Sequence, residues 1–200
     1  IFAGYYDHYL LHLSSCKNKN LFSLNKKYFE KFIKPFIRNS LLKNPYKYIK
    51  NPNDRRHVYD ESDKLKNFLI KTKTFSFKEK PYSQDLMRKR MMNELFNEAV
   101  PVILYEDDMN SMMHSIENRS PFLTQNLVNL LNSLPSKKYI KNGYTKKILR
   151  DIAKEYLPDK IRLERKKVGF NSSILDVAEI KYEEFISSIK SNNYLKEIIN

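Results

Sequence analysis

Apolar and polar residues alternate at helical spacing through most of the first half of the chain. Residues 5–13 place aromatic, His and Leu side chains at this spacing and run into Ser14-Ser15, which predicts a helix continuing from an upstream segment. Residues 26–43 carry an apolar stripe opposite a lysine-rich face, and Pro35 is expected to kink or split this helix. The stripe is predicted to be core and consists of Phe29, Phe32, Ile33, Phe36 and Ile37.

The second half keeps the helical period and adds start and stop signals. Ser83 is expected to cap a long helix that runs until Pro101 breaks the hydrogen-bond ladder. Thr124 can cap a helix whose apolar face is Leu127, Val128, Leu130 and Leu131. The Gly143-Tyr144-Thr145 turn precedes another helix, which Pro158 stops, and the last 20 residues are again predicted to be helical.

Segments without this helical period are predicted to be loops. Together with the predicted helices, they indicate the fold class. Residues 44–53 and 72–81 are expected to be loops, and only the Asn142-Gly143 turn suggests a hairpin. The sequence therefore predicts a mainly α chain that forms a single domain over residues 1–200. No apolar run approaches the roughly 18 residues that span a bilayer, and no signal peptide is evident, so we expect a cytoplasmic protein without a membrane partner.

Composition gives the chain a core and a strong positive charge. A hydrophobic content of 41% is enough to bury one sizeable core, which excludes a disordered chain. The net charge of +14 raises the question of nucleic-acid or phosphate partners. Because Lys and the 20 Asn spread over almost every block, we favour a solvated basic surface and expect no nucleic-acid partner. The competing hypothesis, a non-catalytic nucleic-acid-binding module, predicts steeply salt-dependent binding.

Two features that could indicate metal or redox chemistry are weak. Cys16 is the only cysteine, so the chain has neither an internal disulfide nor a CxxC pair. His8 and His12 are four residues apart, but no Glu accompanies them in an HExxH pattern. We therefore predict no metal site from these residues.

Four short segments follow one another along the chain. They are Ile1 to Tyr5; Asp108 to Met112 leading into Ser115 to Leu123; Asn142 to Arg150; and Tyr156-Leu157-Pro158 followed by Arg165 to Phe170. In their order and separations, these segments together resemble the asparagine synthase family. In addition, Asn93 to Phe96 and Val100 to Leu104 resemble a subgroup found with bacterial surface-polysaccharide genes.

The resemblance implies the helical C-terminal part of an α/β synthetase domain of the adenine-nucleotide α-hydrolase-like (ATP pyrophosphatase) type. Such enzymes activate a carboxylate with Mg-ATP and amidate it with ammonia, which an N-terminal glutaminase domain releases from glutamine. Their Ser-Gly-Gly-x-Asp-Ser pyrophosphate loop and a Gly-Ala-Asp-Glu stretch are not in this sequence. We therefore expect a truncated portion that is inactive alone, and a homodimer is implied by the resemblance only.

The segment from Arg165 to Phe170 resembles the family loop that carries an essential lysine, which places that lysine at Lys167. A compact ammonium can stabilise charge that develops on phosphate oxygens as an acyl-adenylate forms. Gly169 would let the loop turn tightly beside a ligand. A solvated basic run is the alternative, and Lys166 is the candidate if the match is one residue out.

A group of acidic residues with one arginine supplies further candidates for the acyl-acceptor pocket. The group is Glu106, Asp108, Glu117 and Arg119, with Asp108 and Glu117 as the catalytic candidates. The ungapped match puts the family's amine-assisting acid near Ile103, which is apolar, so the base stays unassigned. Asp108 and Glu117 are nine residues apart and need a turn to share a cleft. Alternatively, Glu117 and Arg119 form a structural ion pair that holds Pro121-Phe122.

Lys146 and Thr124 are two further positions at which the sequence makes a prediction. Lys146 and Arg150 are four apart on a predicted helix and could both reach phosphate; the alternative is two solvated helix charges, and Lys146 is the binding candidate. Thr124 stands where the family usually has Asp, and since both are good N-caps the exchange preserves helix initiation. The activity implied is ATP-dependent amidation of aspartate, and the rival substrate is a uronate sugar of surface polysaccharides.

Overall fold

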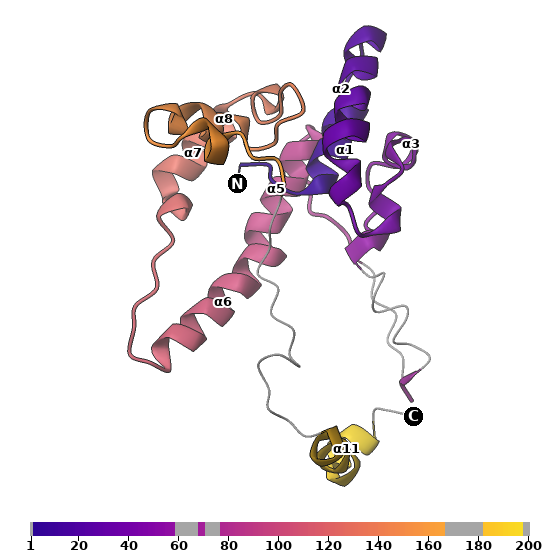
Figure 1. Ribbon diagram of the computed structural model, residues 1–200, viewed down its shortest axis with the longest axis vertical. Coiled ribbons are helices and arrows are strands. Elements are labelled where there is room, and N and C mark those ends of the chain that lie inside the picture. Colours follow the sequence, from indigo (N-terminus) through magenta and orange to yellow (C-terminus); the bar gives the residue numbers. More distant parts are fainter. Residues whose placement is uncertain (1, 59–67, 71–76, 167–181, 198–200) are drawn as a thin grey trace. The chain divides into compact units, whose positions relative to one another are not determined.

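The computed structural model describes residues 2–58, 68–70, 77–166 and 182–197 of the 200-residue chain (Figure 1). The chain divides into two compact units, residues 1–54 with 78–166 and residues 55–77 with 167–200. Each unit is described by itself. The expectation of a single domain stays a prediction.

The described residues form helices and no β-strand, which confirms the mainly α prediction. The first unit holds α1 (Tyr6–Ser14), α2 (Lys19–Phe32), η1 (Lys34–Phe36), η2 (Ser40–Leu42), α3 (Pro45–Lys50), α5 (Leu86–Phe96), α6 (Ala99–Met112), η5 (Pro121–Leu123), α7 (Gln125–Ser133), η6 (Ser136–Lys138), α8 (Lys147–Ile152), η7 (Ala153–Glu155) and α9 (Asp159–Arg162). The second unit holds η3 (Arg56–Val58), α11 (Tyr182–Ser191) and α12 (Asn193–Lys196). Elements marked η are short 3₁₀ helices.

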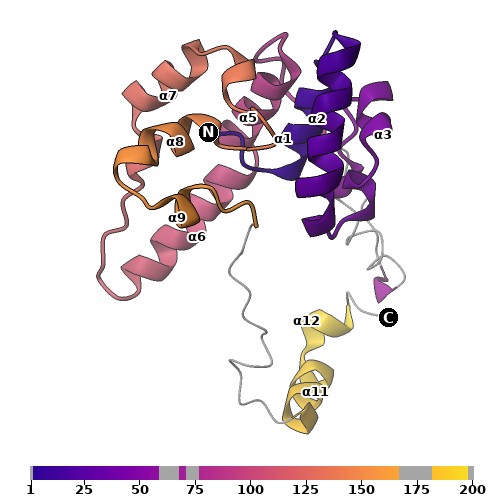
Figure 2. The same ribbon diagram turned by 45° about the horizontal axis from the view of Figure 1, so that its top comes forward.

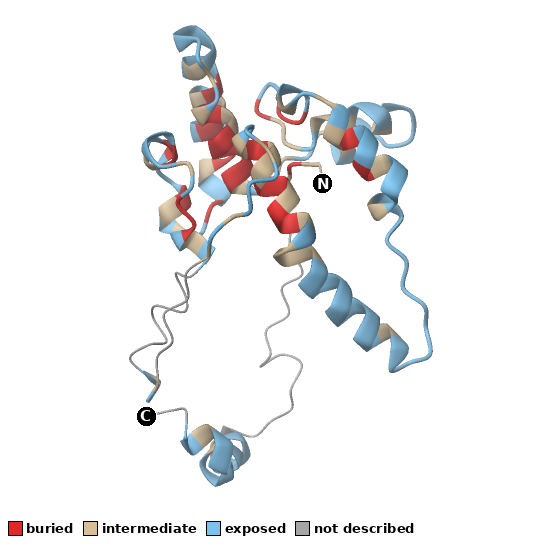
Figure 3. Cartoon of the chain, turned by 180° about the vertical axis from the view of Figure 1, so that it is seen from behind, coloured by how far each residue is buried: buried red, intermediate tan, exposed pale blue. Residues whose placement is uncertain are grey.

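Helix α1 is the centre of the first unit's core. It contacts α2, α3 and α5, and buried residues gather on α1, α2 and α5 (Figure 3). Its apolar residues Tyr9, Leu10, Leu11 and Leu13 are all buried, while the Tyr9 hydroxyl donates to the Asn25 carbonyl at 3.1 Å. The prediction of a helix over residues 5–13 is confirmed, with its start at Tyr6.

Helix α2 corrects the predicted helix over residues 26–43. It begins earlier because the Asn18 carboxamide oxygen accepts the N–H groups of Asn20 and Leu21 and so caps the first turn. It ends at Phe32, and Pro35 lies in the following 3₁₀ turn, where its missing N–H costs nothing. Of the predicted stripe, Phe29, Ile33 and Ile37 are buried, Phe32 is half-buried and Phe36 is exposed.

The predicted loop over residues 44–53 is wrong, because it contains α3. The Asn44 side chain accepts the N–H of Tyr46, and Pro45 occupies the first helical position, where its fixed φ favours the helix. Asn and Pro are common in loops, yet here this pair begins a helix that buries Tyr48. Of the other predicted loop, residues 72–76 lie outside the described residues, and 77–81 have no regular structure.

The long helix predicted from Ser83 to Pro101 is two helices. Asp85, not Ser83, is the N-cap of α5, since its carboxylate accepts the Arg88 N–H at 2.8 Å. The break falls between Phe96 and Ala99, before the proline. Pro101 lies in the first turn of α6, where backbone N–H groups have no intrahelical partner, so it does not interrupt hydrogen bonding.

Helices α7, α8 and α9 follow one another on one side of the first unit (Figure 2). Thr124 is the N-cap of α7 as predicted, although it acts through its backbone carbonyl, which accepts the Val128 N–H, rather than through its side chain. Of the predicted apolar face, Val128 and Leu131 are buried, whereas Leu130 is 57% exposed.

Truncating Leu131 tests the packing of α7. Leu131 is only 2% exposed, so Leu131→Ala should lower the free energy of unfolding by roughly 2–3 kcal/mol, the lower part of the range for buried leucines. The neighbouring Leu130→Ala variant is the control and should cost below about 0.5 kcal/mol. Denaturant unfolding of both variants is the measurement. Equal losses would mean that α7 is rotated from the position described.

In the second unit, the predicted C-terminal helix is confirmed for the described residues as α11 and α12. The Asn192 side chain caps α12 by accepting the Leu195 N–H at 3.1 Å. Elsewhere in this unit, the Arg55 guanidinium lies 5.2 Å from the centroid of the Phe77 ring. Among the described residues, no helix combines the length and the apolar character needed to cross a membrane.

Candidate functional site

Three segments far apart in the sequence meet at the start of the chain. The Phe2 ring meets the Phe122 ring edge to face, with centroids 5.6 Å apart. The Ala3 carbonyl accepts the N–H of Lys146 at 3.4 Å, and the Lys146 side chain passes over Gly4. We call these five residues the chain-start junction.

The junction holds backbone conformations that L-residues rarely adopt. Ala3 and Lys146 both lie in the left-handed region, at φ 55° and 53°. Each such residue costs about 1–3 kcal/mol, and strain of this kind gathers at functional sites. A Cβ at Gly4 would overlap Lys146 Cε, so a larger residue there would displace the end of the lysine side chain. The strain and the close packing mark the junction as a candidate site.

A tight turn adjoins the junction. Lys141 and Tyr144 exchange backbone hydrogen bonds of 3.1 and 2.9 Å around Asn142 and Gly143, whose φ values are 53° and 75°. Two positive φ values are typical of a type I′ turn, so the predicted Asn142-Gly143 turn is confirmed. A Cβ at Gly143 would lie 2.9 Å from a guanidinium nitrogen of Arg165, which makes glycine necessary there for packing as well.

Arg165 packs against this turn and so holds the end of the described segment, residues 164–166, next to it. Its guanidinium carbon lies 3.6 Å from the Tyr144 ring centroid and 3.7 Å from that of Phe32, so the cation is sandwiched between two rings. Its Nη1 also donates to the Gly143 carbonyl at 3.5 Å. The position of Arg165 is therefore set by α2 and by the turn together.

Glu164 orders the same stretch of backbone. Its carboxylate accepts the N–H groups of Lys166 and Arg165, both at 2.7 Å. These two donated hydrogen bonds lower the pKa of Glu164, because they favour the ionised form. Lys166 itself is exposed.

The cation sandwich can be measured by a double-mutant cycle. Combining Arg165→Leu with Tyr144→Leu should give a coupling energy of about 1 kcal/mol in the free energy of unfolding. The control pair is Lys31 and Phe32, in which the lysine Nζ lies 5.1 Å from the centroid of a single ring. That coupling should stay below about 0.5 kcal/mol. A coupling near zero for Arg165 and Tyr144 would show that the stacked geometry contributes nothing to stability.

The structure places Lys146 and Arg150 differently from the prediction. Lys146 precedes α8 as its N-cap and does not lie on the helix face. Arg150 donates to the carbonyl oxygens of Thr145, at 2.9 Å, and of Arg162. Burial lowers the pKa of Arg150. Its guanidinium thus joins two backbone segments, and of the pair only Lys146 is an exposed phosphate-binding candidate.

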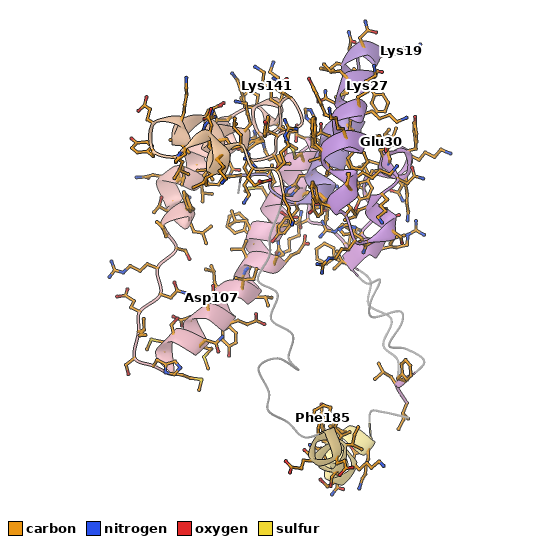
Figure 4. The ribbon with its side chains drawn as sticks, in the orientation of Figure 1. Lys19, Lys27, Glu30, Asp107, Lys141 and Phe185 are labelled. Carbon is orange, nitrogen blue, oxygen red and sulfur yellow. The ribbon has the colours of Figure 1, made fainter. Side chains whose placement is uncertain are left out.

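The acidic candidates Glu106 and Asp108 lie on α6, a helix without a buried residue. Figure 4 shows their neighbour Asp107 on this helix, away from the helix that carries Lys19, Lys27 and Glu30. The predicted turn after Asp108 is present, since Ser115 has φ 56° and the Ile116 N–H bonds the Ser111 carbonyl at 3.0 Å. Within the part of the chain that the structure describes, no hydrogen bond or ion pair joins Asp108 to Glu117.

Glu117 and Arg119 form the ion pair that the structural alternative predicted. Both guanidinium contacts, at 2.9 and 3.0 Å, go to the two carboxylate oxygens. The side chains are 70% and 80% exposed, so solvent screens the pair and it adds little stability. Phe122 packs on Phe2, not on this pair. The substrate-binding role of Arg119 stays a prediction.

Lys167 and Gly169 lie outside the described residues, and so does Phe170, which set the match. The choice between Lys167 and Lys166 is therefore still a prediction. The described structure ends this stretch at Lys166, next to the anchored Arg165.

A buried charge network that the sequence analysis missed ties α1 to α5. Arg90 is 1% exposed, and its guanidinium contacts the carboxylates of Asp7 and Glu79. Lys89 adds a second cation 3.2 Å from Glu79. Burial disfavours the charge of Arg90, but Asp7 and Glu79 outweigh it and raise its pKa. Since Asp7 follows Gly4 by three residues, this network positions the chain start.

His8 adjoins the network through Glu94. Its Nε2 lies 2.9 Å from a Glu94 oxygen, although poorly aligned for an N–H donor. Asp7, His8 and Glu94 are buried and place their potential ligand atoms within 4.8 Å of one another. Arg90 already supplies a cation to Asp7, and its charge would repel a metal ion there. His12 packs instead against Tyr9, so the two histidines do not share a site.

The contacts described here join all four segments singled out in the sequence. The chain belongs to the asparagine synthase family: the family model described as asparagine synthase matches residues 1–197. It is also similar to asparagine synthetase [glutamine-hydrolyzing] 1 of Bacillus subtilis (strain 168), with 33% identity over 87 residues. This match covers 44% of the chain and 14% of that relative, so the chain spans a small part of the relative's length. No solved structure matches the chain.

Proposed function

We propose that the protein containing this chain is an ATP-dependent amidotransferase that converts aspartate to asparagine. Aspartate would be activated as an acyl-adenylate with Mg-ATP, and ammonia released from glutamine would displace AMP. The family match over residues 1–197 carries this proposal. An N-terminal glutaminase domain and a homodimer belong to the same proposal.

Lys167 is the proposed electrostatic stabiliser. Attack of a carboxylate on the α-phosphate builds negative charge on phosphate oxygens, and a nearby ammonium stabilises it most in the transition state. The anchoring of Arg165 between Phe32 and Tyr144 supports this role, because it fixes the backbone two residues upstream. Lys146, exposed and held over Gly4, is the proposed second phosphate contact.

Glu117 and Arg119 are the proposed residues for the amino-acid substrate, with Glu106 and Asp108 nearby in the sequence. Aspartate carries both an ammonium and carboxylates, so its recognition needs side chains of both signs. Because the Glu117–Arg119 pair is exposed and adds little stability, a substrate can exchange with either partner at low cost. Arg119 can then donate two N–H groups to a substrate carboxylate in a two-point contact.

The test is AMP and amide formation by the full-length protein with Mg-ATP and glutamine. Aspartate should support formation of AMP in step with asparagine. The same assay with uronic-acid sugars examines the rival substrate: AMP formed only with a uronate would overturn the assignment of aspartate. If neither acceptor yields AMP, the amidotransferase proposal itself fails.

A further inference from the structure

A pocket of about 320 Å³ lies between α1, α2 and the segment from Lys137 to Asn142. His12 comes from α1, and Leu24 and Tyr28 come from α2. No residue of the chain-start junction lines this pocket. Its volume is at the small end of the range typical for ligand sites, roughly 300–1,000 Å³.

The wall contributed by α2 is apolar and open to solvent. Leu21 and Leu24 line the pocket and are 50% and 44% exposed, although leucines on an amphipathic helix usually face the core. Ile140, which is buried, lies on the opposite side. An apolar group of a ligand would remove this surface from water.

Three lysines on the same segment give the pocket its charge. Lys137, Lys138 and Lys141 line it and are exposed, and none of them pairs with an acidic residue in the described part of the chain. By contrast, Lys34 in η1 lies 2.6 Å from Glu30 of α2. Among the described residues, no acidic side chain lines the pocket. Several cations around a concave apolar wall make the electrostatic potential in the pocket positive.

His12 adds a polar group without adding charge. Burial lowers its pKa, against a smaller opposing effect of its hydrogen bond with Asn25, so the imidazole is neutral near pH 7. The Asn25 amide is already committed to the Leu21 carbonyl at 2.9 Å. A neutral imidazole can donate one hydrogen bond to a ligand or accept one from it.

We propose that this pocket binds a small organic anion, with its carboxylate or phosphate held by Lys137, Lys138 and Lys141 and its apolar body against Leu21 and Leu24. The charge arrangement selects an anion, and the exposed leucines select one with an apolar part. Figure 4 shows Lys141 at the edge of this region, beside the helix that carries Lys27. None of the described residues proposed for amidation lines the pocket, and the proposal does not depend on that function.

The test compares three probes by calorimetry on the full-length protein: phenyl phosphate, inorganic phosphate and phenol. Phenyl phosphate combines an anion with an apolar ring, so its Kd should be at least about tenfold lower than that of either half alone. A Lys138→Ala/Lys141→Ala variant should weaken phenyl phosphate by about tenfold or more. Leu24→Ser should weaken phenyl phosphate but leave inorganic phosphate unchanged.

The matched control is Lys19→Ala/Lys154→Ala, which removes the same charge at exposed positions outside the pocket. It should leave phenyl phosphate binding within about twofold, and circular dichroism of each variant checks that the fold is retained. If the control weakens phenyl phosphate binding equally, the loss comes from net charge alone, and the proposed site is overturned. Equal affinity for the three probes would also overturn the site. So would an oligonucleotide that binds at this site when phenyl phosphate does not.

Discussion

Replacing Lys167 with alanine in the full-length protein is expected to lower the rate of amidation by on the order of 100-fold, the scale of losing one preorganised electrostatic partner. The reason is that the ammonium is proposed to act on charge that exists mainly in the transition state. The loss should therefore fall on kcat, with a much smaller change in the KM for ATP. Glutamine hydrolysis should be nearly unchanged, since the proposed function places it in a separate N-terminal domain.

The adjacent lysine is the matched control for this prediction. Lys166→Ala should be mild, because Lys166 is exposed and its backbone N–H, not its side chain, makes the contact with Glu164. Lys167→Arg should restore little activity, since a planar guanidinium does not place charge where a compact ammonium does. A severe Lys166→Ala and a harmless Lys167→Ala would move the assignment by one residue, and full activity of both would end it.

Helical periodicity predicted most of the helices but not their ends. The bounds of α2 and α3 depend on side-chain caps at Asn18 and Asn44, and an asparagine signals a loop as readily as a helix start. Helix α6 was missed for another reason. Its apolar side chains do not gather on one face, and none of its residues is buried. The sequence of this helix therefore shows no amphipathic pattern that would predict it.

Of the five residues of the chain-start junction, only Lys146 was named from the sequence as a site candidate, and none of their contacts was predicted. Four segments could be recognised along the sequence, yet the pairing of Ala3 with Lys146 and of Phe2 with Phe122 depends on tertiary packing. The assignment of Arg150 to phosphate ignored the backbone carbonyls that a nearby turn brings within reach. The Asn142-Gly143 turn was predicted correctly, because its conformation is local.

Arg90 illustrates a signal that was present but not used. Met87, Arg90, Met91 and Glu94 share one face of α5 at the spacing of a buried stripe, so two charged residues occur among apolar ones. Charged residues on such a face are buried only when they are paired. The pattern therefore pointed to a partner elsewhere in the chain, and Asp7 on α1 and Glu79 before α5 are the partners found.

Removing Arg90 should be among the most destabilising single changes in the first unit. Arg90→Ala leaves the carboxylates of Asp7 and Glu79 buried without their main cation, and breaking a buried pair in this way costs about 3–5 kcal/mol in the free energy of unfolding. Hydrogen exchange of α1 and α5 amides in the full-length protein measures the loss locally. The exposed pair of Lys34 with Glu30 is the control, and Lys34→Ala should cost less than about 1 kcal/mol.

A compensated variant separates the missing charge from the missing packing. In Arg90→Met/Asp7→Asn, one carboxylate is neutralised and an unbranched side chain fills most of the volume, so part of the lost stability should return. Glu79 keeps its contact with Lys89 at 3.2 Å, which limits the remaining cost. If Arg90→Ala alone costs less than about 1 kcal/mol, water reaches these carboxylates and the network does not hold α1 against α5. If the compensated variant is as unstable as Arg90→Ala, neutralising a carboxylate recovers no stability, and the electrostatic account of this contact is wrong.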